Sequence, residues 1–146
     1  MYKDTRGKRT VGVGFNMDAG DSARKIWEKS GINKDFNMVR DGKQELTRRE
    51  AAVLANASYE NAVNDARRFV PGLDQLDPVR REAVIDMSYQ MGGVRLSKFT
   101  TLRKALKEGK YNLAYRSIVG SKYGKDKDTK ARAKENALMI LHGRRI

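Results

Sequence analysis

Strand-like alternation occurs in one short stretch of this 146-residue chain, and this asymmetry strongly limits the folds open to it. In residues 10–14, Val11 and Val13 alternate with Gly12 and Gly14, which is typical of a strand whose two faces differ. The preceding Asp4-Thr5-Arg6-Gly7 is a turn signal, because Asp bonds the backbone ahead of it and Gly accepts positive φ. The opening residues therefore predict a small β-hairpin, and the rest of the chain has helical patterning.

The first helical pattern follows the N-cap candidates Asp21 and Ser22 and ends before Gly31. Within it, Trp27 is either a core residue or a sugar-stacking residue, and its helical spacing from Ala23 and Ile26 favours the core. Residues 33–44 have little periodicity and predict a loop, anchored by its apolar residues Phe36, Met38 and Val39.

A long helix is predicted from Thr47 to about Arg68. Thr47-Arg48-Arg49-Glu50 fits a capping box, in which the Thr hydroxyl and the Glu carboxylate each accept from a backbone N–H. Glu50 could instead be a catalytic acid, but the capping role explains its position better.

The C-terminal half predicts four further helices. Asp77 is a candidate N-cap before Pro78, and the wide apolar face that follows predicts a helix buried in the middle of a lobe. Gly92-Gly93 is expected to break the chain. Two short helices should end at Gly109 and Gly120, and Thr129 can cap a last helix that ends before Gly143.

These patterns predict an α+β fold in one domain, residues 1–146. Its expected parts are a hairpin lobe at 1–46, a connecting helix at 47–68 and a mainly helical lobe at 69–146.

Three segments carry a resemblance to a known family. The string from Tyr2 to Gly14 resembles the active-site hairpin of the bacteriophage-type lysozymes, muramidases that cut peptidoglycan. Asp77 to Gly92 resembles the central helix of that family's C-terminal lobe, and Arg132-Ala133-Lys134 resembles the start of a late helix that faces the cleft. Because order and spacing agree over nearly the whole chain, the resemblance implies a lysozyme-like fold.

The resemblance also implies a set of site residues. Asp4 and Thr10 match the family's catalytic Asp and Thr, which orient a water molecule. The implied substrate-binding residues are Gly14, Tyr89, Gln90, Met91, Thr129 and Arg132. On this basis Asp4, Thr10 and Arg132 should converge on one cleft. Two ordinary alternatives stay open: an isolated Asp-x-x-Gly often only caps a turn, and Tyr and Met at helical spacing are often core residues.

The family's general acid is a Glu that lies upstream of the hairpin, and only three residues precede Asp4 here. The resemblance therefore implies that this chain alone is at best a weak muramidase. Glu135 lies one helical turn after Arg132 and is a conceivable substitute acid, but a neighbouring Arg lowers the pKa of a carboxyl, so a surface ion pair is the simpler expectation.

Composition limits the cofactors and partners that the chain could have. The chain has no Cys and one His, so it predicts no metal site and no disulfide, and no cofactor motif is present. The formal charge of +13 favours anionic partners, among them peptidoglycan and nucleic acid. No apolar run approaches the roughly 18 residues of a membrane span, and the start lacks the apolar core of a signal peptide.

Three hypotheses follow. The first is a monomeric phage muramidase whose sequence here lacks the N-terminal catalytic helix, through a late start or processing. It would be made in the host cytoplasm and act on the cell wall in the periplasm or from the virion. The second is a lysozyme-fold phage protein without catalysis, with a binding, structural or regulatory role, whose partner is glycan, a virion component, a regulator or an N-terminal segment. The third, a nucleic-acid-binding module, is permitted by charge but supported by no motif.

Overall fold

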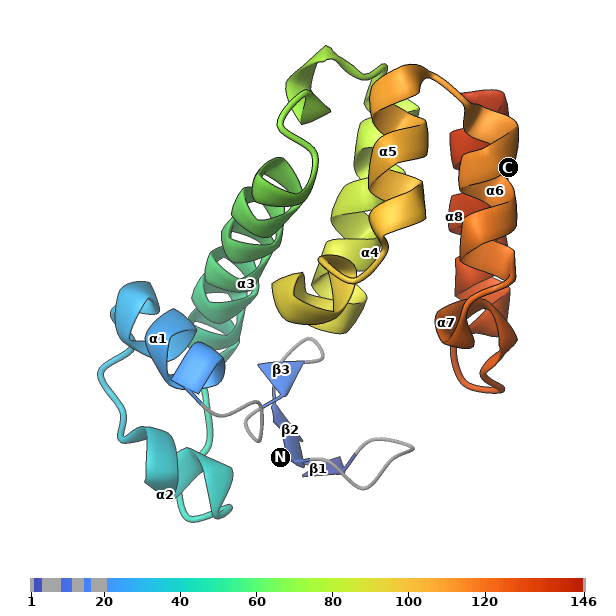
Figure 1. Ribbon diagram of the computed structural model, residues 1–146. Coiled ribbons are helices and arrows are strands. Elements are labelled where there is room, and N and C mark those ends of the chain that lie inside the picture. The colour runs from blue at the N-terminus through green and yellow to red at the C-terminus, as the bar shows by residue number, and fades with distance from the viewer. Residues whose placement is uncertain (1, 4–8, 12–14, 17–20, 146) are drawn as a thin grey trace. The chain divides into compact units, whose positions relative to one another are not determined.

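A computed structural model describes residues 2–3, 9–11, 15–16 and 21–145, with side chains from residue 23 onward (Figure 1). Helices make up most of this part. They are α1 (Asp21–Ser30), α2 (Phe36–Arg40), α3 (Arg48–Phe69), the 3-10 turn η1 (Leu73–Gln75), α4 (Pro78–Leu96), α5 (Thr100–Glu108), α6 (Tyr111–Val119), α7 (Lys122–Lys125) and α8 (Lys130–His142).

Three very short strands precede the helices: β1 (Tyr2–Lys3), β2 (Arg9–Val11) and β3 (Phe15–Asn16). They pair antiparallel in the order β1-β2-β3, with Thr10 opposite Tyr2 in one pair and Asn16 in the other. Strands of two or three residues lie at or below the usual range of roughly 3–10 residues.

The predicted fold class is therefore wrong. The described residues are overwhelmingly helical and contain no β lobe, so this part of the chain is helical and not α+β. The alternation that suggested a hairpin is too short, and too rich in glycine, to specify a sheet with a buried face of its own.

The predicted loop at residues 33–44 is also wrong in part, because it contains α2. Asp35 is the N-cap of this helix, and its Oδ1 accepts a hydrogen bond from the backbone N–H of Met38 at 3.0 Å. Phe36 and Val39 are buried one helical turn apart. A cap and two anchors are enough for a helix of five residues, which is too short to show a periodic pattern.

The chain divides into two compact units, Met1–Asn61 and Ala62–Ile146, with the division inside α3. In the first unit the described core consists of Ala23, Trp27, Phe36, Val39 and Leu54. The Trp27 and Phe36 rings meet edge to face at 5.5 Å, and the indole N–H donates to the carbonyl oxygen of Lys34 at 3.1 Å. Trp27 is thus a core residue, as its spacing predicted.

The capping box at the start of α3 is confirmed. The backbone N–H of Glu50 donates to Thr47 Oγ1 at 3.1 Å, and the backbone N–H of Thr47 donates to Glu50 Oε1 at 2.9 Å. Lys34 Nζ also donates to Glu50 Oε1 at 2.5 Å. These hydrogen bonds account for the Glu50 carboxylate as a structural group.

The second unit has the larger core, built on α4. The side chains of Val84 and Met87 are fully buried, and α6 packs against α5 and α8 while α8 also packs against α4 (Figure 1). The buried hydroxyl of Ser88 donates to the carbonyl oxygen of Ala62 at 2.8 Å, which ties α4 to the second half of α3. The predicted central helix is therefore buried in the middle of this unit.

The predicted chain break at Gly92 is a kink within α4. Gly92 has φ 81° and ψ 160°, and helical geometry resumes after it up to Leu96. This backbone conformation is essentially restricted to glycine, which explains the residue at that position. The last turns of α4 therefore leave the direction set by its first part.

Candidate functional site

The predicted catalytic residues are only partly within the described chain. Asp4 and Gly14 lie outside the described residues. Thr10 lies in β2, where its backbone pairs with Tyr2 and Asn16. The convergence of Asp4, Thr10 and Arg132 on one cleft stays a prediction.

Three predicted substrate-binding residues lie together on α4, just before its kink. Tyr89 is 38% exposed, Gln90 is exposed, and Met91 is half-buried against the main core. Partial burial raises the pKa of the Tyr89 phenol. Tyr89 and Gln90 thus offer surface to a ligand, whereas Met91 also supports the core.

Arg132, near the start of α8, binds Asp86 of α4 through two hydrogen bonds. Its Nε donates to Asp86 Oδ2 at 3.0 Å and a terminal nitrogen donates to Asp86 Oδ1 at 2.7 Å. These bonds and the negative charge of Asp86 raise the pKa of Arg132. The ion pair that the structure describes for Arg132 is thus with Asp86, a carboxylate 46 residues away in the chain, and the charge of Glu135 acts on the Arg132 pKa in the same direction but less strongly.

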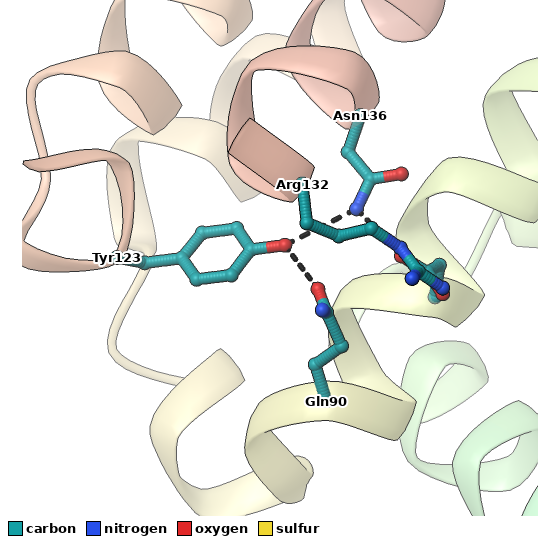
Figure 2. A network of polar contacts seen from close by, with 5 residues as sticks. Gln90, Tyr123, Arg132 and Asn136 are labelled. Atoms are coloured by element: carbon teal, nitrogen blue, oxygen red, sulfur yellow. Dashed lines mark hydrogen bonds and ion pairs between the residues drawn. The ribbon is translucent and has the colours of Figure 1, made fainter. Parts of the chain in front are cut away.

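Asn136 extends this pair into a network. Its side-chain nitrogen donates to Asp86 Oδ2 at 2.8 Å and to the hydroxyl of Tyr123 at 3.1 Å, and the residue is 3% exposed. The Tyr123 hydroxyl in turn donates to the side-chain carbonyl oxygen of Gln90. Figure 2 shows Tyr123, Asn136 and Gln90 meeting at the phenolic oxygen, with Arg132 beside them. We call Asp86, Gln90, Tyr123, Arg132 and Asn136 the polar network.

Tyr123 is the centre of the polar network and comes from α7. Burial raises its pKa to about 12, and the negative charge of Asp86 acts in the same direction. Its ring meets that of Phe99 edge to face, with the ring centroids 6.5 Å apart. The phenol therefore remains a neutral hydroxyl that both accepts and donates at neutral pH.

Thr129 does not make the predicted capping bond, and its predicted substrate-binding role stays a prediction. It stands at the N-cap position of α8, but its side chain makes no capping bond and its Oγ1 donates to the carbonyl oxygen of Tyr123 at 2.6 Å. Ser121 caps α7, accepting from the backbone N–H of Gly124 at 3.1 Å. These two hydroxyls hold the segment that presents Tyr123 to α4.

Sequence reasoning missed three members of the polar network: Asp86, Tyr123 and Asn136. Asp86 and Asn136 lie on the apolar faces of α4 and α8 or directly beside them. Because a polar side chain at such a position needs a hydrogen-bond partner, this pattern is the signal that could have identified both residues. Nothing in the sequence indicates that residues 86, 123 and 136 are hydrogen-bonded to one another.

The arrangement fixes the side-chain amide of Gln90. Because its carbonyl oxygen accepts from Tyr123, its NH₂ group is left as a hydrogen-bond donor, and Tyr89, its neighbour in the chain, is partly exposed. An exposed amide and a partly exposed aromatic ring on one helix suit a ligand rich in hydroxyl and amide groups.

The described part of the chain contains neither a candidate metal site nor a candidate membrane-spanning helix. Its His, Asp and Glu residues form no group of three or more that could hold a metal ion. None of its helices combines the length and apolar character that crossing a membrane requires.

The chain is similar in sequence to two proteins of known name, although no protein-family model matches it. It is 26% identical over 116 residues to Probable T4-type lysozyme 2 of Dictyostelium discoideum, which covers 76% of this chain and 68% of that protein. It is also 26% identical over 159 aligned positions to the pre-baseplate central spike protein Gp5 of Enterobacteria phage T4, which covers 98% of this chain but 25% of that protein. These matches agree with the resemblance carried by the three sequence segments, so the chain has distant sequence similarity to phage-type lysozymes.

Proposed function

We propose that the chain is a phage-type muramidase that hydrolyses the β-1,4 bond between N-acetylmuramic acid and N-acetylglucosamine in bacterial peptidoglycan. The observation that carries this proposal is the similarity to a T4-type lysozyme over 76% of the chain. Residues 1–146 would act together as one lysozyme-like domain.

Glycosidases of this kind use two carboxyl groups on opposite faces of the scissile bond, one to protonate the leaving oxygen and one to position water or attack the sugar. Asp4 would be the water-orienting carboxylate and Thr10 would hold the same water. Arg132 would act as a positioning residue, because its Nε and one terminal nitrogen both donate hydrogen bonds to Asp86.

Substrate would contact the exposed end of the first part of α4. Tyr89 supplies a partly exposed ring and Gln90 an oriented amide donor, both suited to the N-acetyl and hydroxyl groups of the glycan. Gly14 and Met91 would complete the binding surface as in the family, and Thr129 would act by holding the segment of Tyr123.

The basic character of the chain supports a cell-wall partner. A charge of +13 attracts the carboxylates and phosphates of wall polymers over a distance of about one Debye length. We infer that a monomer made in the host cytoplasm acts on the wall, either in the periplasm or from the virion. The match to a central spike protein over 98% of this chain supports the virion context.

A second candidate function rests on that same match. A lysozyme-fold part of a phage particle could bind glycan or a neighbouring virion protein without cleaving the glycan. This alternative would keep the polar network as structure and would not need Asp4.

Lysis of outer-membrane-permeabilised cells separates the two functions. We expect slow loss of turbidity with this chain and less with Asp4→Asn, which keeps the size of the side chain but removes its charge. Equal clearing by both forms would contradict the role of Asp4. Sedimentation with purified peptidoglycan, compared with duplex DNA over a salt series, should show retention on peptidoglycan that weakens towards 1 M salt, where the Debye length is about 3 Å.

A further inference from the structure

The second unit has a groove that the polar network does not use. It lies between the segment that follows α3 and one face of α5, and its volume is about 660 Å³. The groove is lined by Val70, Pro71, Gly72, Gln75, Leu76, Thr100, Arg103, Lys104, Leu106 and Lys107. This volume lies within the range of sites for small molecules and short peptide segments, roughly 300–1,000 Å³.

The two sides of the groove differ in chemistry. The segment after α3 contributes an apolar wall in which Val70 is buried, Leu76 is half-buried and Pro71 is exposed. Leu106 of α5 is buried beneath it. The exposed amide of Gln75 lies on the same side and provides a hydrogen-bonding group.

The opposite rim is basic. Arg103, Lys104 and Lys107 are exposed on α5, and Lys107 lies four residues after Arg103 and three after Lys104, so it shares a face of the helix with each of them. None of the three forms an ion pair with a residue in the described ranges. Their charges are therefore available to an anionic partner.

The acidic residues nearest in sequence are already engaged. Asp74 pairs with Arg67 at 3.3 Å, and Glu108 pairs with Lys110 at 3.1 Å. The hydrogen bond from Lys110, together with the charges of Lys104 and Lys107, lowers the pKa of Glu108. The groove thus keeps an excess of positive charge along one edge and an apolar surface along the other.

We propose that this groove is a docking site for an acidic peptide segment of a partner protein, with an apolar side chain against Val70 and Leu76 and carboxylates on Arg103, Lys104 and Lys107. Charge complementarity identifies the carboxylates, and the apolar wall identifies the anchor. A nucleic acid fits less well, because none of the described residues that line the groove is aromatic and single-stranded bases bind largely by stacking. The site is independent of glycan hydrolysis and involves no member of the polar network.

Binding of a synthetic peptide tests this proposal. The probe is a fluorescein-labelled peptide in which Leu is flanked on both sides by Glu, measured by anisotropy with the full chain at low salt. Two control peptides replace the Leu with Ser, or every Glu with Lys. The groove variant is Lys104→Glu with Lys107→Glu. Its matched control is Lys25→Glu with Lys29→Glu, which makes the same change in net charge at exposed positions of α1.

We expect the Glu/Leu peptide to bind, and the groove variant to bind it at least about tenfold more weakly than the Lys25/Lys29 control does. The Leu→Ser peptide should also bind more weakly to the unmodified chain, since the apolar wall would lose its ligand. An equal loss in the two charge-reversed variants would overturn the proposal, because it would show only attraction to net charge. Binding of the Lys peptide as tight as that of the Glu peptide would overturn it too. Vesicles of anionic phosphatidylglycerol are a third probe, measured with the same variants. If the vesicles bind the chain, lose binding in the groove variant alone, and the Glu/Leu peptide does not bind, the proposal is overturned.

Discussion

The guanidinium of Arg132 donates one hydrogen bond to each carboxylate oxygen of Asp86, at 3.0 and 2.7 Å. This pair joins the start of α8 to the middle of α4, and Asn136 adds a third donor to the same carboxylate. Asp86 is therefore linked to Gln90 through Asn136 and Tyr123.

The first prediction concerns the energy of that pair. Since Arg132 is 55% and Asp86 24% exposed, a double-mutant cycle with Arg132→Ala and Asp86→Ala should give a coupling of about 1 kcal/mol in the free energy of unfolding. The coupling should shrink in 1 M salt. The pair Arg145–Glu82, which is 70% and 42% exposed, is the matched control and should couple less strongly. A larger coupling in the control pair would contradict the importance given to Asp86.

The second prediction concerns Tyr123. Tyr123→Phe removes a hydroxyl that accepts from Asn136 and donates to Gln90, so it should destabilise the chain by about 1 kcal/mol at neutral pH. Because burial raises the folded-state pKa from 10.0 to about 12, the unfolded chain loses this proton first as pH rises. The stability contributed by Tyr123 is thus complete below pH 10 and is lost as pH rises towards about 12.

Denaturant unfolding of the native chain and of Tyr123→Phe across this pH range gives the measurement. The stability advantage of the native chain should fall as pH rises through the window. Tyr59→Phe, which removes a residue that is 44% exposed, controls for the loss of one tyrosine from the optical signal. An advantage that grows with pH would have the wrong sign for a buried neutral phenol.

Sequence patterns predicted the helices far better than the fold class. The α3 capping box, the core role of Trp27 and the buried α4 face all follow from local spacing, because a helix places residues three or four apart on one side. The three strands have two or three residues each, and their pairing depends on residues distant in sequence. The alternation in residues 10–14 is therefore a clear local pattern, but it was a poor guide to the fold class.

The candidate site was predicted as positions but not as contacts. Gln90 and Arg132 were identified from the family resemblance, and both belong to the polar network. Asp86, Tyr123 and Asn136 could not be predicted to meet, because their contacts span 13 to 50 residues and depend on how α4, α7 and α8 pack. Helical periodicity reports which face of a helix is buried and does not report its partner.

The third prediction concerns the cap of α3. Thr47→Ala removes the acceptor of the Glu50 N–H and should lower the free energy of unfolding by about 1 kcal/mol. The hydrogen bonds from Lys34 and from the Thr47 backbone lower the pKa of Glu50, so its contribution is present above its unfolded-state pKa and is lost as pH falls through the folded-state value. Glu50→Gln should therefore weaken the decline in stability below about pH 4.5, the ordinary pKa of this group. The exposed Glu45→Gln serves as control, and an equal effect there would argue against the cap.

The fourth prediction concerns the kink of α4. Gly92→Ala should destabilise the chain by about 1–3 kcal/mol, because φ 81° with ψ 160° is strained for any residue with a Cβ. An added Cβ would meet no atom within 4 Å, so the cost comes from the backbone alone. Gly72→Ala is the matched control, because its φ of −91° is open to alanine and its added Cβ makes ordinary contact at 3.6 Å. Thermal unfolding that ranks the two variants in the opposite order would exclude backbone strain at Gly92.

The central proposal is that this chain cleaves peptidoglycan and that Asp4 orients the attacking water. A general acid usually contributes about 10²–10⁴ in rate, so a Glu placed opposite Asp4 should accelerate the reaction. The most direct measurement is mass spectrometry of the fragments released from purified peptidoglycan by three proteins: this chain, its Asp4→Asn variant, and a form extended at the N-terminus by a helix that carries a Glu opposite Asp4. We predict slow release of fragments with N-acetylmuramic acid at the reducing end, about 10²-fold or more faster release by the extended form, and loss of release in Asp4→Asn. Rapid release by the chain itself would show that another carboxyl, with Glu135 the first to test as Glu135→Gln, supplies the proton. Absence of these fragments with all three proteins would contradict the claim and favour the non-catalytic alternative.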